Sequence, residues 1–230
     1  MTPKEKKKMA ALQAIKFIQP GMVIGLGTGS TATEFIKAIG KCVKEGLEIL
    51  GIPTSDFTRR KAEELGIPLT TLRAHPLPAL AVDGADELDG KLRLIKGGGG
   101  ALLREKIVAS AAEKFIIIAD DSKYVKALGS FPLPIEVLPF GLEATIKLIR
   151  EVLIALNLPS NVKVRKTISN HSFKTDSDNM VVDCELSRIT DPETLSAMLS
   201  AIPGVIEHGL FIGLASTAIV AGDQGVKILR

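Results

Sequence analysis

The stretch MVIGLGTGSTATEFIKAIGKCV, residues 22–43, decides the fold. Its first five residues, Met22 to Leu26, form a short apolar run that is typical of a buried strand. Glycines follow directly, and apolar residues then recur at helical spacing, which indicates an amphipathic helix. The members of this apolar stripe are Ala32, Phe35, Ile36, Ile39 and Val43. A strand, a glycine turn and a helix in this order begin an α/β fold.

The same alternation continues as far as residue 119. Further strands are predicted at residues 47–52, 80–82, 92–95 and 115–119, and helices at 58–65 and 102–112. Asp89-Gly90 is a hairpin signal just before the strand at 92–95. Strands that alternate with helices predict an α/β fold with a doubly wound, mostly parallel, Rossmann-like sheet.

A second, smaller domain is predicted from residue 131 onward. The segment FPLPIEVLPF, residues 131–140, holds three prolines in ten residues, which is typical of a domain boundary. Beyond it, a helix at 142–156, strands near 162–168 and 180–184, and a helix from Asp191 are predicted. This order resembles the β-α-β-β-α-β pattern of a ferredoxin-like α+β domain.

The tail from Gly209 is apolar and strand-like, so we expect it to return to the first sheet. We therefore predict a catalytic domain of residues 1–130 plus 209–230. Residues 131–208 form the smaller domain in this prediction, and we expect it to serve oligomerisation.

Composition narrows the possible functions. The 230 residues include no Trp and one Tyr, and the net charge is only +3, so a nucleic-acid groove is not expected. No run approaches the roughly 20 apolar residues of a membrane span, and the N-terminal MTPKEKKKMA lacks an apolar signal core. Cys42 and Cys184 lie far apart and are interpreted as buried thiols in a reducing compartment. These features predict a cytoplasmic protein.

Gly27-Thr28-Gly29-Ser30-Thr31 follows the first predicted strand and opens a helix. Glycines allow a close backbone approach, and a helix N-terminus favours phosphate. Two alternatives remain open: a tight turn without a ligand, and a relaxed dinucleotide fingerprint, G-x-G-x-x-A, that ends at Ala32. The second alternative expects an acid at the end of the second strand, where the first acid is instead Asp56.

Asp83-Gly84-Ala85-Asp86-Glu87 places three carboxylates within five residues, directly after a buried strand. Such clustering is costly, because like charges repel. The group could cap a helix or form a solvated turn, or Asp83 and Asp86 could bind a divalent metal, although a full shell needs further oxygens. We favour a third interpretation, in which the carboxylates accept hydrogen bonds from sugar hydroxyls.

The third motif, KGGGGALLREK, spans residues 96–106. Four consecutive glycines carry a high entropic cost and make sense where the backbone lies against a ligand. Glu105 falls near a predicted helix start, where its anion is favoured. It could be a simple capping residue, but its position beside the glycines and Lys96 favours a functional role.

The fourth motif is Asp120-Asp121-Ser122-Lys123, after the strand at 115–119. All four motifs follow predicted strands, and ligands bind at the carboxyl ends of strands in open α/β sheets. Among the N-terminal lysines at 4, 6, 7 and 8, which read as a solvated helix start, one could reach a phosphate. The three histidines lack metal-ligand spacing and are interpreted as structural or surface residues.

Together, GTGST, DGADE, KGGGGALLREK and the later IPGVIEHGLFIGLA resemble type A ribose-5-phosphate isomerase. The resemblance covers nearly the whole chain, including IPTS at residues 52–55. It implies a two-domain α/β enzyme of the pentose phosphate pathway that needs no metal or cofactor and forms a homodimer or homotetramer. Two segments depart from the family pattern, namely residues 157–174 and the turn Thr175-Asp176-Ser177-Asp178-Asn179, where the family carries a glycine.

The resemblance also implies the site. The expected substrate-binding residues are Lys7, Thr28, Gly29, Ser30, Thr31, Asp83, Gly84, Ala85, Asp86, Lys96, Gly97, Gly98, Gly99 and Lys123. The expected catalytic residues are Glu105 as general base, with Asp83 and Lys96.

Moving a carbonyl between C1 and C2 requires a proton to leave one carbon and reach the other through a cis-enediolate, and one carboxylate can serve both. Lys96 and the glycine-loop amides are candidates to stabilise the oxyanion, and Asp83 is the candidate for ring opening. Three alternatives stay open: a nicotinamide-dependent oxidoreductase, a non-enzymatic sugar-phosphate sensor, and an isomerase of a related pentose phosphate.

Overall fold

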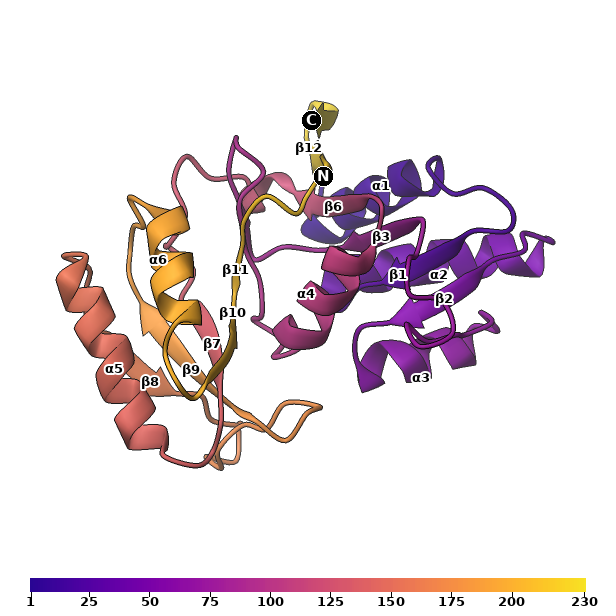
Figure 1. Cartoon of the computed structure of the whole chain (residues 1–230). Coiled ribbons are helices and arrows are strands. Elements are labelled where there is room, and N and C mark those ends of the chain that lie inside the picture. Colours follow the sequence, from indigo (N-terminus) through magenta and orange to yellow (C-terminus); the bar gives the residue numbers. More distant parts are fainter. The chain divides into compact units, whose positions relative to one another are not determined.

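The strand predicted at residues 22–26 is observed as β1 (Val23–Leu26), in the interior of a six-stranded sheet. The structure, a computed structural model, describes residues 1–230 and divides into two units (Figure 1). Unit 1 comprises residues 1–85, 104–124 and 213–230, and unit 2 comprises residues 86–103 and 125–212. Each unit has its own buried apolar core.

The sheet of unit 1 confirms the predicted mostly parallel arrangement. Only β13 runs antiparallel to its neighbour. The tail does return to this sheet as β12 and β13. The strand order is β13 (Gly225–Leu229), β12 (Thr217–Gly222), β6 (Phe115–Asp120), β3 (Leu80–Asp83), β1 and β2 (Leu50–Pro53).

Helices cover both faces of this sheet, as doubly wound folds require. Ile24 and Leu26 of β1 share a core with α1 (Pro3–Ile15) and α2 (Ser30–Lys44). Gly25 faces the other way, and a Cβ there would lie 2.5 Å from Val108 of α4 (Leu102–Ala111). Because neighbouring strand residues point to opposite faces, α4 lies on the face opposite α1 and α2. The remaining helices of unit 1 are α3 (Asp56–Glu64) and the 3₁₀ helix η1 (Asp121–Lys123).

The chain reverses direction across the sheet at β1. From β1 it passes to β2 on one side, and then to β3 on the other side. In open α/β sheets, the crevice outside the carboxyl ends of the strands at such a reversal is where ligands bind. The loops after β1 and β3 therefore occupy the expected ligand edge of unit 1.

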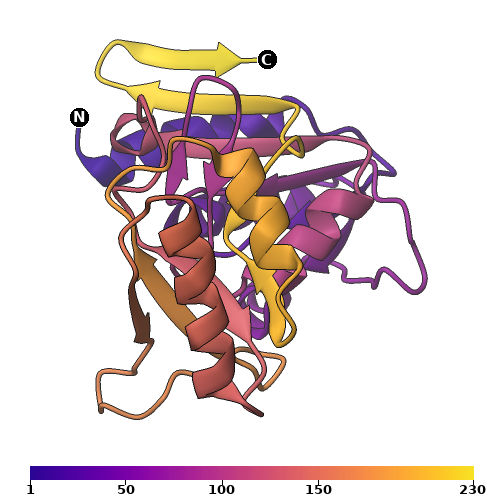
Figure 2. The same ribbon diagram turned by 60° about the vertical axis from the view of Figure 1, so that its left-hand side comes forward.

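Unit 2 contains a four-stranded antiparallel sheet with two helices (Figure 2). Its strand order, β10-β7-β9-β8, and its β-α-β-β-α-β sequence confirm the predicted ferredoxin-like arrangement. The elements are β7 (Leu133–Val137), α5 (Leu142–Ala155), β8 (Asn161–Val164), β9 (Met180–Glu185), α6 (Pro192–Ser200) and β10 (Val205–His208).

The three-proline segment is not simply a boundary, because its centre forms β7, an interior strand. Pro134 is tolerated in this strand because the pairing of β7 with β10 ends at the neighbouring residue, Ile135. The carbonyl of Pro134 still accepts a hydrogen bond from Gly209, whose own carbonyl accepts from Lys96 instead. The missing proline N–H therefore leaves no sheet partner unsatisfied.

Residues 86–103 belong to unit 2, although the sequence predicted them in the first domain. The Asp89-Gly90 hairpin forms as predicted, but β4 (Glu87–Leu88) and β5 (Leu94–Ile95) join β11 (Leu210–Phe211) in a separate three-stranded sheet of unit 2. These two-residue strands offer few hydrogen-bonding groups, and they use them to pair with each other and with β11. As a result, the glycine motif at 96–100 does not follow a strand of the main sheet.

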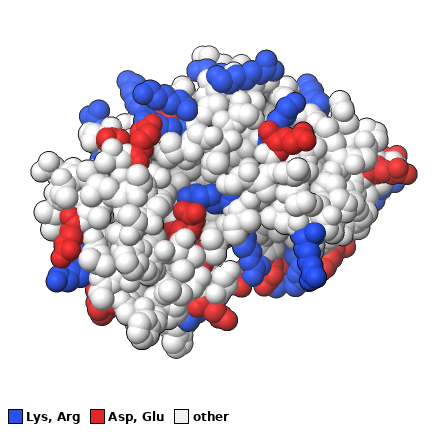
Figure 3. Space-filling view, in the orientation of Figure 1, with Lys and Arg blue, Asp and Glu red and all other residues white.

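The surface and helices show two general features. On the face drawn in Figure 3, Lys and Arg side chains are interspersed with Asp and Glu. None of the helices has both the length and the apolar character needed to cross a membrane.

Candidate active site

The turn after β1 requires glycine. Gly27 donates its N–H to the carbonyl of Val82 on β3, at 3.0 Å. A Cβ at Gly27 would lie 2.2 Å from the carboxyl carbon of Asp83 and 2.6 Å from its Cα. The loop after β1 can therefore pass this close to the end of β3 only with a residue that lacks a side chain.

The N-terminus of α2 is open to an anion. Gly29 caps the helix with φ 116°, a conformation that favours glycine, and no side chain accepts a hydrogen bond from the first turn. Ser30 and Thr31 begin the helix, so their amides and hydroxyls surround its positive end. This confirms the predicted strand–turn–helix context of a phosphate site, although the occupant remains a proposal.

Thr28 is fixed by a cluster of hydroxyl groups that sequence reasoning missed. Its Oγ1 lies 2.8 Å from Thr54 Oγ1, 2.8 Å from Ser55 Oγ and 3.1 Å from Thr58 Oγ1. Thr58 Oγ1 also donates to the carbonyl of Gly27, at 2.9 Å. These residues follow β2, the neighbouring parallel strand, and lock the phosphate loop in place. The run Thr54-Ser55-x-x-Thr58 after a predicted strand was the available signal.

Lys7 reaches the same helix end from α1. Its Nζ donates to Ser30 Oγ at 2.9 Å, which places a positive charge beside the uncapped turn. The preceding Lys6 binds both carboxylate oxygens of Asp121 at 2.9 and 3.0 Å, and it binds Asp223 at 3.1 Å. The hydrogen bond with Asp121 raises the pKa of Lys6. Lys6 therefore anchors α1, and Lys7 points to the loop.

Asp83 ends β3 in a buried position, with 2% of its surface exposed. One of its oxygens, Oδ1, accepts from the amides of Thr28 at 3.0 Å and Gly84 at 2.7 Å. Hydrogen bonds to the charged form stabilise a carboxylate in such a place. Asp83 thus joins the phosphate loop to the acidic motif, and Gly84 and Ala85 complete this motif within unit 1.

Glu105 lies in the first turn of α4, as predicted, and is 5% exposed. The preceding residue, Arg104, forms an ion pair of 3.2 Å with Asp56 at the start of α3, directly after β2. This pair holds the start of α4 at the carboxyl edge of the sheet. Glu105 is therefore a buried carboxylate at the ligand edge of unit 1. Because Asp56 is engaged by Arg104, it is a poor candidate for the acid of a dinucleotide site.

Lys123 ends η1, the short turn that follows β6. Asp120 caps this turn by accepting from the amide and the hydroxyl of Ser122. The parallel strands β1, β3 and β6 are consecutive neighbours in the sheet. The half-buried Lys123 therefore lies at the same edge as the motifs after β1 and β3.

The glycine loop belongs to unit 2. Asp86 accepts from the amide of Gly98 at 2.8 Å, and a Cβ on Gly98 would lie 2.8 Å from Asp86 Oδ1. Gly97 and Gly100 have positive φ values of 104° and 79°, so both favour glycine. Lys96 is 2% exposed, and its Nζ lies 5.5 Å from the ring centre of Phe211. At Gly99, in contrast, neither the backbone angle nor the surrounding space demands glycine.

Two further residues of unit 2 touch this loop and were not predicted. Arg165 donates to the carbonyls of Gly97 at 2.8 Å and Gly98 at 3.0 Å. The ring of Phe173 fills the space where Gly100 would carry a Cβ, at 2.4 Å. Both lie in the 157–174 stretch that departs from the family pattern. An acid within the apolar strand β9, Asp183, was the available signal, because such a residue needs a partner.

The predicted set thus divides between the units. Asp86, Lys96 and Gly97 to Gly99 lie in unit 2, and the others lie in unit 1. The unit boundaries fall within two of the motifs, after Ala85 and after Leu103. No group of three or more His, Cys, Asp or Glu side chains has an arrangement suited to a metal ion. Independence from metal remains a prediction.

Comparison with known proteins gives a consistent result over the whole chain. The sequence profile of ribose 5-phosphate isomerase A (phosphoriboisomerase A) matches residues 50–225. Ribose-5-phosphate isomerase A of Parvibaculum lavamentivorans is 54% identical over 100% of both chains. A solved D-ribose-5-phosphate isomerase in complex with phospho-erythronic acid is 42% identical, with a TM-score of 0.93 and full coverage of both chains. The ribose 5-phosphate isomerase of Plasmodium falciparum is 39% identical, with a TM-score of 0.93 over 99% of this chain and 98% of that one.

Proposed function

Because the chain belongs to the ribose 5-phosphate isomerase A family, we propose that it interconverts D-ribose 5-phosphate and D-ribulose 5-phosphate. One observation in the structure carries the proposal. An uncapped helix N-terminus with an adjacent lysine lies at the same sheet edge as the buried carboxylate Glu105. The first part suits a phosphate, and the second suits proton transfer at carbon.

The phosphate end of the substrate is assigned to the loop of residues 28–31 with Lys7 and Lys123. The amides of the first turn of α2 and the Ser30 and Thr31 hydroxyls donate to phosphate oxygens. Lys7 and Lys123 supply positive charge. These phosphate contacts are remote from the reacting carbons, so their binding energy helps to orient the sugar.

The chemistry is assigned to Glu105. Its carboxylate takes the proton from C2 of the open-chain aldehyde, and the electron pair forms the C1–C2 double bond while O1 becomes an oxyanion. A proton then moves from O2 to O1. Glu105 returns its proton to C1, and O2 becomes the carbonyl oxygen. Such a base contributes about 10²–10⁴-fold.

The remaining residues bind and polarise the sugar. Lys96 and the amides of Gly97 and Gly99 stabilise the charge on the enediolate oxygens, and the amide of Gly98 holds Asp86 in place. Asp83, Gly84, Ala85 and Asp86 bind hydroxyls, and Asp83 assists ring opening. A relative solved with phospho-erythronic acid supports a site for a sugar phosphate, because that ligand combines a phosphate with a carboxylate.

We further propose a cytoplasmic homodimer or homotetramer that associates through residues 131–208. Two apolar side chains of unit 2 support an interface there, since Phe140 is 91% exposed and Ile154 is 61% exposed. A dehydrogenase role has less support, because the family match and the Arg104–Asp56 pair both oppose it.

Formation of ribulose 5-phosphate from ribose 5-phosphate, measured with EDTA present, tests the proposal. We expect full turnover without added metal or nicotinamide. Absence of turnover with ribose 5-phosphate would refute the assigned reaction. If turnover occurs but stops with EDTA, the reaction stands and the metal-free prediction fails. A thermal shift with NAD or NADP, without turnover of ribose 5-phosphate, would favour the dehydrogenase alternative.

A further inference from the structure

The guanidinium of Arg165 divides its hydrogen bonds between two groups of unit 2. Its Nε and Nη2 bind the two carboxylate oxygens of Asp183 on β9, with the Nε contact at 2.8 Å. Its Nη1 binds the carbonyls of Gly97 and Gly98 at 2.8 and 3.0 Å. A planar guanidinium suits this task, because its donors point in fixed directions. The bidentate pair with Asp183 fixes the plane, and Nη1 then fixes the loop.

These bonds set the direction of the loop amides. In a trans peptide, the C=O and N–H groups point in opposite directions. Since the Gly97 carbonyl faces Arg165, the amide of Gly98 faces away, and it does donate to Asp86 at 2.8 Å. Since the Gly98 carbonyl also faces Arg165, the amide of Gly99 likewise faces away. The Gly99 amide makes no hydrogen bond within the chain, so it is available to a ligand.

The surroundings keep this arrangement rigid. The Arg165 side chain is 14% exposed, and its guanidinium carbon lies 5.7 Å from the ring centre of Phe173. That ring packs where Gly100 lacks a side chain. The amide of Gly100 donates to the Gly97 carbonyl at 2.9 Å, so this carbonyl accepts two hydrogen bonds. Hydrogen bonds to a cation polarise a peptide and strengthen its N–H as a donor.

We propose that Arg165, held by Asp183, is a positioning residue for the isomerase reaction, because it aims the Gly99 amide at the enediolate oxyanion. The inference rests on the proposed function and adds a residue to it. Arg165 touches neither the substrate nor Glu105 in this account. It acts through two peptide groups, and the effect of losing it is confined to the step in which negative charge develops.

Kinetics of Arg165→Met test the proposal. We expect kcat to fall about 10- to 100-fold, less than the roughly 10²–10³-fold loss on removing an oxyanion donor, because the amide is misdirected and not removed. KM is expected to stay within about threefold of wild type. Affinity for phospho-erythronic acid, whose carboxylate resembles the enediolate, is expected to fall with kcat. Competitive inhibition by inorganic phosphate is expected to stay unchanged, because Arg165 binds Asp183 and the glycine loop of unit 2, whereas the phosphate loop belongs to unit 1.

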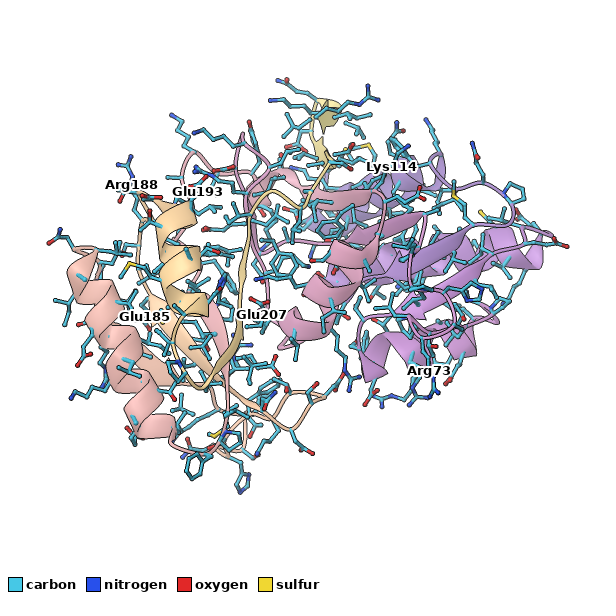
Figure 4. The ribbon with its side chains drawn as sticks, viewed as in Figure 1. Arg73, Lys114, Glu185, Arg188, Glu193 and Glu207 are labelled. Carbon is cyan, nitrogen blue, oxygen red and sulfur yellow. The ribbon has the colours of Figure 1, made fainter.

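Two more variants complete the experiment. Arg188→Met makes the same chemical change at an exposed arginine of unit 2 that projects outward (Figure 4), and it is expected to match wild type. Arg165→Lys keeps the charge but cannot bind Asp183 and both carbonyls at once, so its kcat is expected between those of wild type and Arg165→Met.

The outcomes separate this inference from the proposed function. If wild type does not turn over ribose 5-phosphate, the function itself fails. If wild type is active and folded Arg165→Met keeps kcat within twofold, only the positioning role fails. An equal loss of inorganic phosphate inhibition would also overturn it, since that would indicate general damage. Should Arg165→Met not fold, Arg165→Lys decides, and a kcat within twofold of wild type overturns the proposal.

Discussion

Gly27→Ala tests whether the phosphate loop keeps its conformation only when the chain after β1 can pass close to Asp83 at the end of β3. The new Cβ would lie 2.2 Å from the Asp83 carboxyl carbon and 2.6 Å from its Cα. Carbon atoms pack at about 3.5–4.0 Å, so the loop or Asp83 must move by about 1 Å. Such a shift breaks the 3.0 Å bond between Asp83 and the Thr28 amide. Overpacking costs about 1–3 kcal/mol, which lowers Tm by about 2–12 °C for a chain of this size.

Gly27→Ala is expected to remain folded but to lose most of its activity. A misplacement of about 1 Å costs on the order of 10²-fold in rate, and KM for ribose 5-phosphate and the inhibition constant of inorganic phosphate are both expected to rise. Gly21→Ala is the matched control, because Gly21 has φ 83°, open space around its Cα, and lies before β1, at the other edge. It is expected to lose about 1–2 kcal/mol of stability with normal kinetics. Wild-type phosphate inhibition and kcat in Gly27→Ala would refute the reasoning.

Three further predictions concern single residues. Lys123→Ala is expected mainly to raise KM, as steady-state kinetics would show, and unchanged binding of substrate and inorganic phosphate would mean that this lysine is merely a surface residue. Glu87 is 4% exposed and accepts from the amides of Gly129 at 2.6 Å and Phe131 at 2.7 Å, so Glu87→Gln is expected to lower the free energy of unfolding in urea by about 2 kcal/mol with kcat unchanged. Wild-type urea stability would show that these two bonds do not support unit 2. Burial raises the pKa of the Cys184 thiol to about 12, above its ordinary value of 9.0. The neutral thiol therefore stabilises the fold below pH 9, and this contribution is expected to fade as pH rises from 9 towards 12. Cys184→Ala is expected to show a flatter loss of stability over that range, and an identical slope in the two proteins would contradict the assignment.

The strands of unit 1 could be predicted because they are buried on both faces and read as continuous apolar runs. FIIIA at residues 115–119 and MVIGL at 22–26 are examples. A helix start could also be predicted from its capping residues, as at α6, where Asp191 is the N-cap and Pro192 follows it. The motifs after β1, β3 and β6 could be placed at one edge because parallel strands share their carboxyl edge.

Other features depend on partners distant in the sequence and could not be predicted. β4 and β5 have only two residues each, and their sheet is completed by β11, more than a hundred residues later. Pro134 looks like a strand breaker until the chain at Gly209 is seen to accommodate it. Arg165 reads as an exposed residue at the end of VKVR, because only the fold brings Asp183 and the glycine loop to it. The role of Thr58 was equally hidden in the sequence, because the Gly27 carbonyl to which it donates lies 31 positions away.

The role of Glu105 is tested most directly by turnover of ribose 5-phosphate in deuterium oxide with wild type and Glu105→Gln. The amide keeps the size of the side chain but cannot accept the proton from carbon. We predict that kcat and deuterium incorporation at carbon both fall by at least about 10²-fold, while KM stays within a few-fold. Near-normal turnover or undiminished deuterium incorporation in Glu105→Gln would contradict the assignment of this carboxylate as the base.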